Sequence, residues 1–182
     1  KPQVGVVTGL AWTQFGGDIL PIEVNHFKGS GKFIVTGQLG DVMKESASIA
    51  LDYLKAHADK YRLKDIDFDK QDIHIHVPEG AVKKDGPSAG VTLTTAIYSA
   101  FTQKPVRDDV AMTGEVTLTG NVLPIGGLKE KSISAHRSGI STIIIPKDNA
   151  KDIDDIPESV RKDLTIITAD HIDTVLENAL VK

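Results

Sequence analysis

The spacing of the apolar residues changes near residue 42, and this change restricts the chain to folds that combine strands with helices. Residues 3 to 38 contain short β-type runs, separated by the glycine turns Gly16-Gly17 and 28–31. An apolar residue then recurs after four, three and four positions from Met43 to Leu54, which is the period of a helix that buries one face. We therefore predict two or three antiparallel strands, followed by a helix from Val42 to about Lys60.

The strict alternation in Asp72–Val77 predicts a further strand, with His74 and His76 on the same face. Three further helices are predicted, over residues 88–102, over 128–137 and from 171 onward. The remaining predicted strands cover 110–113, 115–119, 122–125, 142–145 and 164–168. The pattern lacks the regular βαβ rhythm of a doubly wound sheet. The predicted fold class is therefore α/β of the α+β type, with mixed sheets in a single compact domain over residues 1–182.

The composition is that of one globular domain that does not bind nucleic acid. A chain of 182 residues, 40% of them hydrophobic, can bury one core and is short for two domains. Its net charge of −4 argues against a phosphate-binding surface, and no apolar run is long enough to cross a bilayer. The absence of cysteine excludes disulfides and thiolate sites and suits a reducing compartment. Because the chain begins at Lys1, we expect a fragment of a larger protein. The lack of a membrane-spanning run and of a secretory signal predicts a soluble protein, and we expect it in the cytoplasm.

Ser88 lies where a polar loop becomes a predicted helix, within the run Lys83-Lys-Asp-Gly-Pro-Ser-Ala-Gly90. Serine is a common helix N-cap and Gly-Pro is ordinary turn chemistry, so a structural role explains the residue as well as a functional one. In a functional role, the free N–H groups of the helix start would stabilise an oxyanion that forms next to Ser88.

The run Gly86–Gly90 also matches the G-x-S-x-G nucleophile elbow of α/β-hydrolases. Its context differs, because the elbow serine directly follows a buried strand, whereas the eight-residue polar stretch Glu79–Gly86 precedes Ser88. A triad would also need a later acid and histidine, for which Asp170-His171 and Asp173 are poor candidates. Neighbouring residues at a helix start are better explained as a cap.

Paired glycines also open the predicted helix that contains Lys129 and Lys131, in the run Leu123-Pro-Ile-Gly-Gly-Leu-Lys-Glu-Lys131. Both lysines can be explained as part of a solvated helix face. A serine hydrolase without a usable histidine needs another base, however, and a buried lysine can serve because burial lowers its pKa. The two lysines point to nearly opposite sides of the helix, so only one can face a buried site. Spacing alone does not decide which one.

The other candidate ligands do not form a recognisable metal or nucleotide site. His74 and His76 share a strand face, but no third ligand with suitable spacing follows, so structural or interface roles are favoured. Gly31-Lys32 is followed by Phe33 and lacks the earlier glycine of a Walker A loop. We therefore expect no metal and no cofactor in this chain.

Six motifs, in order, make the chain closely resemble the proteolytic domain of ATP-dependent Lon proteases over essentially its whole length. They are Gly9-Leu-Ala-Trp-Thr13, Gly37-Gln-Leu-Gly-Asp-Val-Met-Lys-Glu-Ser46, His74-Ile-His-Val-Pro-Glu-Gly80, Lys84-Asp-Gly-Pro-Ser-Ala-Gly90, Met112-Thr-Gly-Glu115 and Leu123-Pro-Ile-Gly-Gly-Leu-Lys-Glu-Lys131. The Lys-Asp-Gly-Pro-Ser form is similar to that of the soluble bacterial and mitochondrial branch. The resemblance implies the Lon protease domain fold with a Ser–Lys catalytic dyad.

By this resemblance, Ser88 is the nucleophile and Lys131, not Lys129, is its base. Thr113 corresponds to the group that orients the lysine amine through a hydrogen bond. Trp12 belongs to the segment that lines the substrate groove. The supporting residues of the catalytic loop are Asp85, Gly86 and Pro87.

The resemblance also implies partners outside the chain. The whole protease would be an ATP-dependent serine endopeptidase that forms a homo-hexameric ring and degrades unfolded, damaged and regulatory proteins. ATP and Mg would bind an upstream AAA+ module, absent from this chain, which unfolds the polypeptide substrates. Two alternatives stay open: a non-peptidase serine hydrolase, and a catalytically silent domain that only assembles the ring.

Overall fold

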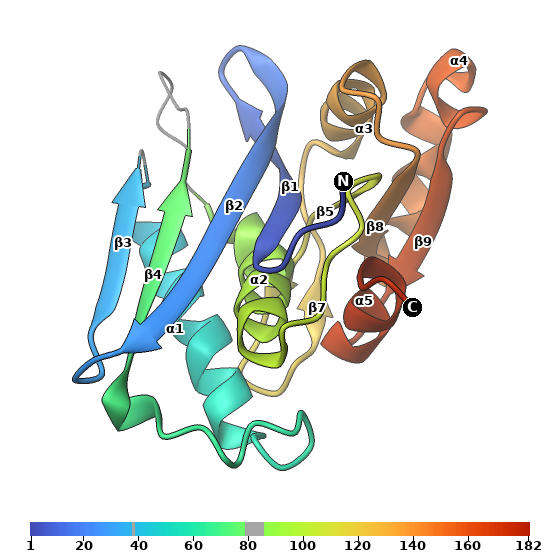
Figure 1. The fold of residues 1–182 in the computed structure, drawn as a ribbon. Coiled ribbons are helices and arrows are strands. Elements are labelled where there is room, and N and C mark those ends of the chain that lie inside the picture. The colour runs from blue at the N-terminus through green and yellow to red at the C-terminus, as the bar shows by residue number, and fades with distance from the viewer. Residues whose placement is uncertain (38, 79–85) are drawn as a thin grey trace.

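A seven-stranded sheet forms the centre of the computed structural model, which describes residues 1–37, 39–78 and 86–182 (Figure 1). The strand order is β3-β4-β2-β1-β5-β8-β9. The bounds of these strands are β1 Val6–Thr13, β2 Gly16–Lys28, β3 Phe33–Gly37, β4 Gln71–Val77, β5 Val110–Met112, β8 Thr142–Pro146 and β9 Thr165–Ala169. A separate hairpin consists of β6 (Glu115–Val116) and β7 (Val122–Leu123). The predicted α/β class with a mixed sheet is confirmed.

In the first half of the sheet, β1 and β2 form the antiparallel hairpin that the turn at Gly16-Gly17 predicts. The expectation of a third antiparallel strand is wrong, because β3 pairs with β4 and runs parallel to it. Helix α1 (Asp41–Ala56) connects these two strands, and a crossover of this length allows parallel pairing. β4 therefore lies between β3 and β2, where Asp72 accepts hydrogen bonds at 2.9 Å from the N–H groups of Ser30 and Lys32.

The second half of the sheet has βαβ connections that the sequence pattern does not show. β1, β5, β8 and β9 are parallel neighbours. Helix α3 (Leu128–Arg137) precedes β8, and the 3₁₀ segment η3 (Lys147–Asp155) with the short helix α4 (Glu158–Arg161) joins β8 to β9. η3 is hard to predict because its only buried residue is the polar Asn149.

Helices cover both faces of the sheet. Ala11 packs in one core with α1, α2 (Gly90–Thr102) and α5 (Ile172–Ala179), whereas its neighbour Leu10 packs in a second core with α3. Every residue of α2 from Gly90 to Phe101 is buried, because the sheet, α1 and α5 all contact this helix. No described helix has the length and apolar character needed to cross a membrane.

Helix α1 is shorter than its apolar spacing predicts. It ends at Ala56 and not at Lys60, and the chain turns over residues 57–62. Within this turn the Leu63 N–H donates to the carbonyl of Ala58 at 2.7 Å. The turn brings the Tyr61 hydroxyl to α5, where it donates to an Asp173 carboxylate oxygen at 2.7 Å. This tertiary contact replaces the last predicted turn of the helix.

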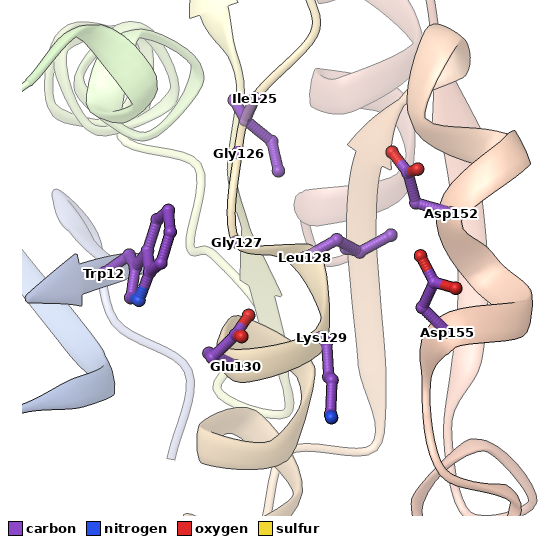
Figure 2. Close-up of a pocket in the computed structure, with 9 residues that line it drawn as sticks. All are labelled: Trp12, Ile125, Gly126, Gly127, Leu128, Lys129, Glu130, Asp152 and Asp155. Atoms are coloured by element: carbon purple, nitrogen blue, oxygen red, sulfur yellow. The ribbon is translucent and has the colours of Figure 1, made fainter.

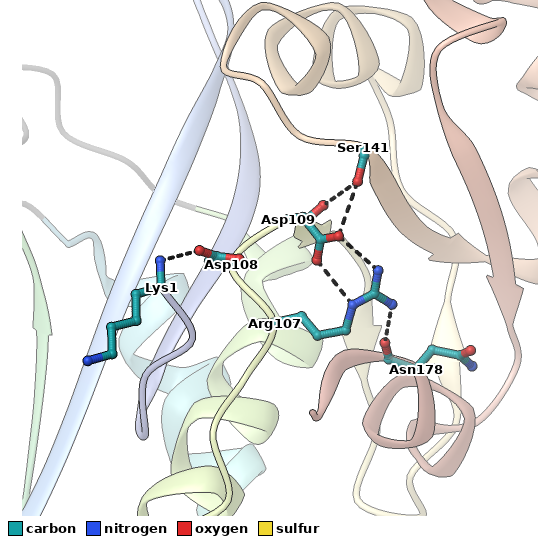
Figure 3. Close-up of polar contacts among 6 residues, drawn as sticks. All are labelled: Lys1, Arg107, Asp108, Asp109, Ser141 and Asn178. Carbon is teal, nitrogen blue, oxygen red and sulfur yellow. Dashed lines mark hydrogen bonds and ion pairs between the residues drawn. The ribbon is translucent and has the colours of Figure 1, made fainter. Parts of the chain in front are cut away.

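A polar cluster joins the amino-terminal ends of β5 and β8 to α5 (Figure 3). Arg107 donates to both carboxylate oxygens of Asp109 at 3.1 Å and to the carbonyl of Asn178 at 3.2 Å. The Ser141 hydroxyl donates to the same carboxylate at 3.3 Å. The Arg107 guanidinium therefore lowers the pKa of Asp109 below its ordinary value. This cluster anchors the end of the strands opposite to the one that carries the candidate site.

Helix α3 approaches the β1–β2 hairpin so closely that only glycine fits at position 17. A Cβ on Gly17 would lie 2.1 Å from the carbonyl oxygen of Glu130. We expect Gly17→Ala to displace α3 and to lower the free energy of unfolding by about 2 to 3 kcal/mol in urea denaturation. Gly16→Ala is the control, because nothing lies within 4 Å of its Cβ and its left-handed backbone costs about 1 kcal/mol. Equal losses in the two variants would contradict the close packing.

Candidate active site

Segments that are far apart in the sequence line a cavity of about 260 Å³. Both candidate catalytic side chains, Ser88 and Lys131, border it. The other residues that line this cavity are Ala11, Trp12, Leu20, Met43, Gly86, Pro87, Glu115, Pro124, Ile125 and Gly126. The fold therefore brings together the two glycine-rich motifs and the tryptophan that the sequence singles out. We call this space the Ser88 cavity.

Ser88 lies in the 3₁₀ turn Pro87–Ala89, directly before α2, and does not cap that helix. Ala89 is the N-cap of α2, and no side chain makes a capping hydrogen bond there. The backbone of the turn is fixed by a hydrogen bond at 2.8 Å from the N–H of Gly114 to the carbonyl of Ser88. A capping role therefore does not explain this serine, and its side chain is available at the cavity wall.

The two lysines of α3 have different environments. Lys129 is exposed, whereas Lys131 is 2% exposed and borders the Ser88 cavity. No described carboxylate forms an ion pair with Lys131. Burial therefore lowers its pKa from 10.5 to about 8, which makes the neutral amine accessible near physiological pH. Burial therefore distinguishes the two lysines, which spacing does not, and only Lys131 borders the cavity.

Thr113 and Gly114 connect the lysine to the turn that carries the serine. Lys131 Nζ donates a hydrogen bond to Thr113 Oγ1 at 3.0 Å. The Thr113 N–H donates to the carbonyl of Ile144 in β8 at 3.1 Å, which fixes this segment to the sheet. The next residue, Gly114, donates to Ser88. One short segment after β5 therefore positions both candidate catalytic residues.

In the described part of the chain, no hydrogen bond joins Ser88 Oγ directly to Lys131 Nζ. The two groups border the same cavity, and the Lys131 amine is oriented by Thr113. Catalytic hydrogen bonds in unliganded enzymes are often long and shorten when substrate binds. A direct hydrogen bond between the two groups would therefore require a change from this arrangement.

Trp12 packs over the start of α3 and borders a second cavity as well. Gly127, the N-cap of α3, has a left-handed φ of 72°, and a Cβ there would lie 2.8 Å from the indole ring. The ring is nevertheless 57% exposed. Figure 2 shows it beside the strip Ile125–Gly127, and ring and strip both line a second cavity of about 510 Å³. An exposed aromatic ring in this place is suited to contact a substrate side chain.

The other candidate residues lie away from this cavity or outside the structure. Asp85 lies outside the described residues. His74 and His76 both hydrogen-bond to Thr36 Oγ1, at 2.8 and 2.7 Å. His171 accepts a backbone N–H at 3.1 Å as the N-cap of α5, in agreement with the cap expected from the sequence. Among the described residues, no group of three or more His, Asp or Glu is placed to hold a metal ion.

Comparison with known proteins identifies the family. Residues 1–182 match the family model of the Lon protease (S16) C-terminal proteolytic domain. The chain belongs to the Lon protease family. It is 61% identical over 182 residues to the Lon protease of Brevibacillus choshinensis and 62% identical over 181 residues to Lon protease 1 of Bacillus subtilis (strain 168). Each match covers 100% of this chain and 23% of the relative, so the chain spans less than a quarter of the length of these curated proteins.

Several residues that line the Ser88 cavity are not predicted from the sequence. Glu115 and Ile125 stand within the recognised motifs, but their spacing does not show that they face the cavity. Leu20 lies in the middle of β2 and reaches the site only because β2 pairs with β1, opposite Gly9. Pro124 precedes the glycine pair and reads as an ordinary turn residue. Each of these positions depends on tertiary contacts, so no local pattern reveals it.

The buried charge of Lys131 should cost stability at neutral pH. Lys131→Met removes the charge at similar volume, so we expect the free energy of unfolding at pH 7 to rise by about 1 to 3 kcal/mol, measured by urea denaturation. The folded-state pKa is about 8 and the unfolded-state value is 10.5, so wild-type stability should rise with pH in this window and the difference should shrink. Lys129→Met, at an exposed position, is the control with little change. A difference that does not depend on pH would show that the lysine is not shifted by burial.

Proposed function

We propose that this chain is the proteolytic domain of an ATP-dependent serine endopeptidase in which Ser88 is the nucleophile and Lys131 is the general base. The observation that carries the proposal is the buried amine of Lys131, with a pKa near 8, on the wall of the same cavity as Ser88. Membership of the Lon protease family supports proteolysis as the activity. Among the described residues no histidine lines this cavity, so lysine is the base that the site offers.

In the first half of the proposed reaction, neutral Lys131 accepts the proton of the Ser88 hydroxyl as the oxygen attacks the scissile peptide carbonyl. The hydrogen bond from Lys131 to Thr113 uses one amine proton and leaves the lone pair of the neutral amine free to accept the proton of Ser88. Backbone N–H groups of the turn beside Ser88 stabilise the oxyanion, because the N–H groups of Gly90 and Val91 at the start of α2 already donate to the carbonyls of Pro87 and Gly114. Lys131 then gives its proton to the leaving amine, and an acyl-enzyme on Ser88 results.

In the second half, water attacks the acyl-enzyme and Lys131 again serves as the base. The Trp12 ring and the apolar side chains of Leu20 and Ile125 form the wall against which the substrate peptide would lie. The proposed chemistry uses only the side chains of the dyad, backbone N–H groups and water. Gly86 and Pro87 would support the turn of Ser88 at the cavity rim, and Asp85 stays a predicted supporting residue.

The complete activity would need parts of a longer protein. The curated relatives named above are more than four times the matched length, because the match covers 23% of each. We propose that residues 1–182 form one proteolytic domain and that an AAA+ module of the same protein binds ATP and Mg, unfolds polypeptide substrates and delivers them. We further propose a homo-hexameric ring in the cytoplasm that degrades unfolded, damaged and regulatory proteins.

The dyad can be tested in the full-length protein with a fluorogenic peptide and a small fluorophosphonate that labels reactive serines. Ser88→Ala should abolish both peptide cleavage and labelling. In the wild type, the labelling rate should rise tenfold per pH unit and level off near pH 8, where Lys131 loses its proton. Lys131→Met should be unreactive over the whole range. Full activity of Lys131→Met would support a non-peptidase or histidine-based hydrolase, and an unlabelled wild type would indicate a catalytically silent domain.

Thr113 should control how well Lys131 is oriented. Thr113→Val keeps the shape of the side chain and removes the acceptor of the amine, so we expect kcat to fall about tenfold or more. Thr113→Ser keeps the hydroxyl and should retain most of the activity. The measurement is single-turnover acylation of Ser88 at pH 8 and at pH 10. If Thr113→Val and Thr113→Ser react at equal rates, the hydrogen bond has no role in catalysis.

A further inference from the structure

The second cavity adjoins the Ser88 cavity and shares a wall with it. Trp12, Ile125 and Gly126 line both spaces. In Figure 2, Trp12 lies on one side of the second cavity, Asp152 and Asp155 of η3 lie on the other, and the strip Ile125–Gly127 runs between them. The second cavity, at about 510 Å³, is the larger of the two. A peptide bound at Ser88 therefore has a continuous path over Gly126 into this space.

The shared strip has little regular structure of its own. Residues 124–127 connect β7 to α3 and belong to neither a helix nor a strand. Gly126 is exposed, and a Cβ there would meet only the Trp12 ring, at 3.7 Å. A segment of this kind keeps its shape only if other groups hold its backbone.

Asn149 of η3 holds this strip through a pair of hydrogen bonds to a single residue. The Ile125 N–H donates to Asn149 Oδ1 at 2.8 Å, and Asn149 Nδ2 donates to the Ile125 carbonyl at 2.9 Å. The side-chain amide thereby replaces the neighbouring strand that this backbone lacks. Asn149 Nδ2 also donates to Asp152 Oδ2 at 2.9 Å, so the same amide orients a side chain on the opposite wall. Asn149 is itself 2% exposed, which leaves it few other conformations.

We propose that Asn149 is a positioning residue for the substrate peptide: through Ile125 it fixes the wall along which the peptide extends from the Ser88 cavity into the second cavity. This proposal rests on the peptidase function proposed above. Asn149 does not contact the reacting atoms, because Ile125 lies between it and the cavity. Its effect should therefore appear in substrate affinity and not in the chemistry of the dyad.

The test uses the full-length protein with ATP and two fluorogenic peptides that share the same cleaved residue. One peptide is short, and the other is extended by several residues on both sides of the scissile bond. The wild type should show a lower KM for the extended peptide. Asn149→Ala and Asn149→Asp should raise the KM of the extended peptide about tenfold, raise the KM of the short peptide by a much smaller factor and leave kcat nearly unchanged. Asn149→Asp has the shape of asparagine but replaces both Nδ2 donations by repulsion from the Ile125 carbonyl and the Asp152 carboxylate, so it tests the polar contacts without a change of side-chain size.

Two further measurements distinguish a positioning role from a general loss of structure. Fluorophosphonate labelling of Ser88 and its pH midpoint should be the same in both Asn149 variants and the wild type. Arg107→Ala is the matched control, because it breaks the polar cluster of Figure 3 at the far end of the strands. It should lower thermal stability without changing the ratio of the two KM values.

Three outcomes would overturn the proposal. The first is an unchanged KM for the extended peptide in both Asn149 variants. The second is an equal loss for the short peptide, the extended peptide and the labelling reagent, which would indicate a structural role. The third is a wild type that does not distinguish the two peptides. The proposed function fails by a different result, namely peptide cleavage that survives Ser88→Ala, so the two failures can be told apart.

Discussion

The site depends on one unfavourable placement, the amine of Lys131 in the protein interior without a described carboxylate to neutralise it. A buried cation is destabilising, and it persists only where the surrounding packing fixes its position. That packing comes from Gly17, which lets α3 lie against the hairpin, and from Thr113, which accepts a hydrogen bond from the amine. The same burial that costs stability lowers the pKa of the lysine to about 8. The burial that suits Lys131 to act as the proposed base therefore also destabilises the fold.

The topology explains how two distant motifs meet at this lysine. β5 is a short parallel strand between β1 and β8, and the chain leaves its carboxyl end at Thr113. Functional groups commonly gather at the carboxyl ends of parallel strands, because the chain passes from strand to helix there. The turn of Ser88 is bound to Gly114, and α3 brings Lys131 to Thr113. The short Met112–Glu115 motif thus works as the support on which the other two motifs are assembled.

The local sequence pattern predicts α3 and β8, the latter from its run of β-branched residues, and the bounds of both agree closely with those expected. It fails where pairing is decided at long range: β3 turns out parallel to β4 because α1 connects them. For the site, local chemistry makes Ser88 plausible, and only burial separates Lys131 from Lys129. Asn149 carries no sequence signal, because its partner Ile125 is 24 positions away and the two hydrogen bonds between them form only in the folded protein.

The site therefore combines two kinds of support. The reacting groups sit on a helix and on a turn bonded to the sheet, where packing limits movement to small displacements. The proposed walls for the substrate instead come from the exposed Trp12 ring and from the irregular strip before α3, which would let a peptide backbone approach closely. Glycines in the strip give that access and remove the side chains that would otherwise hold it. A buried side-chain amide that occupies both backbone groups of Ile125 supplies the missing restraint, which is why the groove can be open and still have a defined shape.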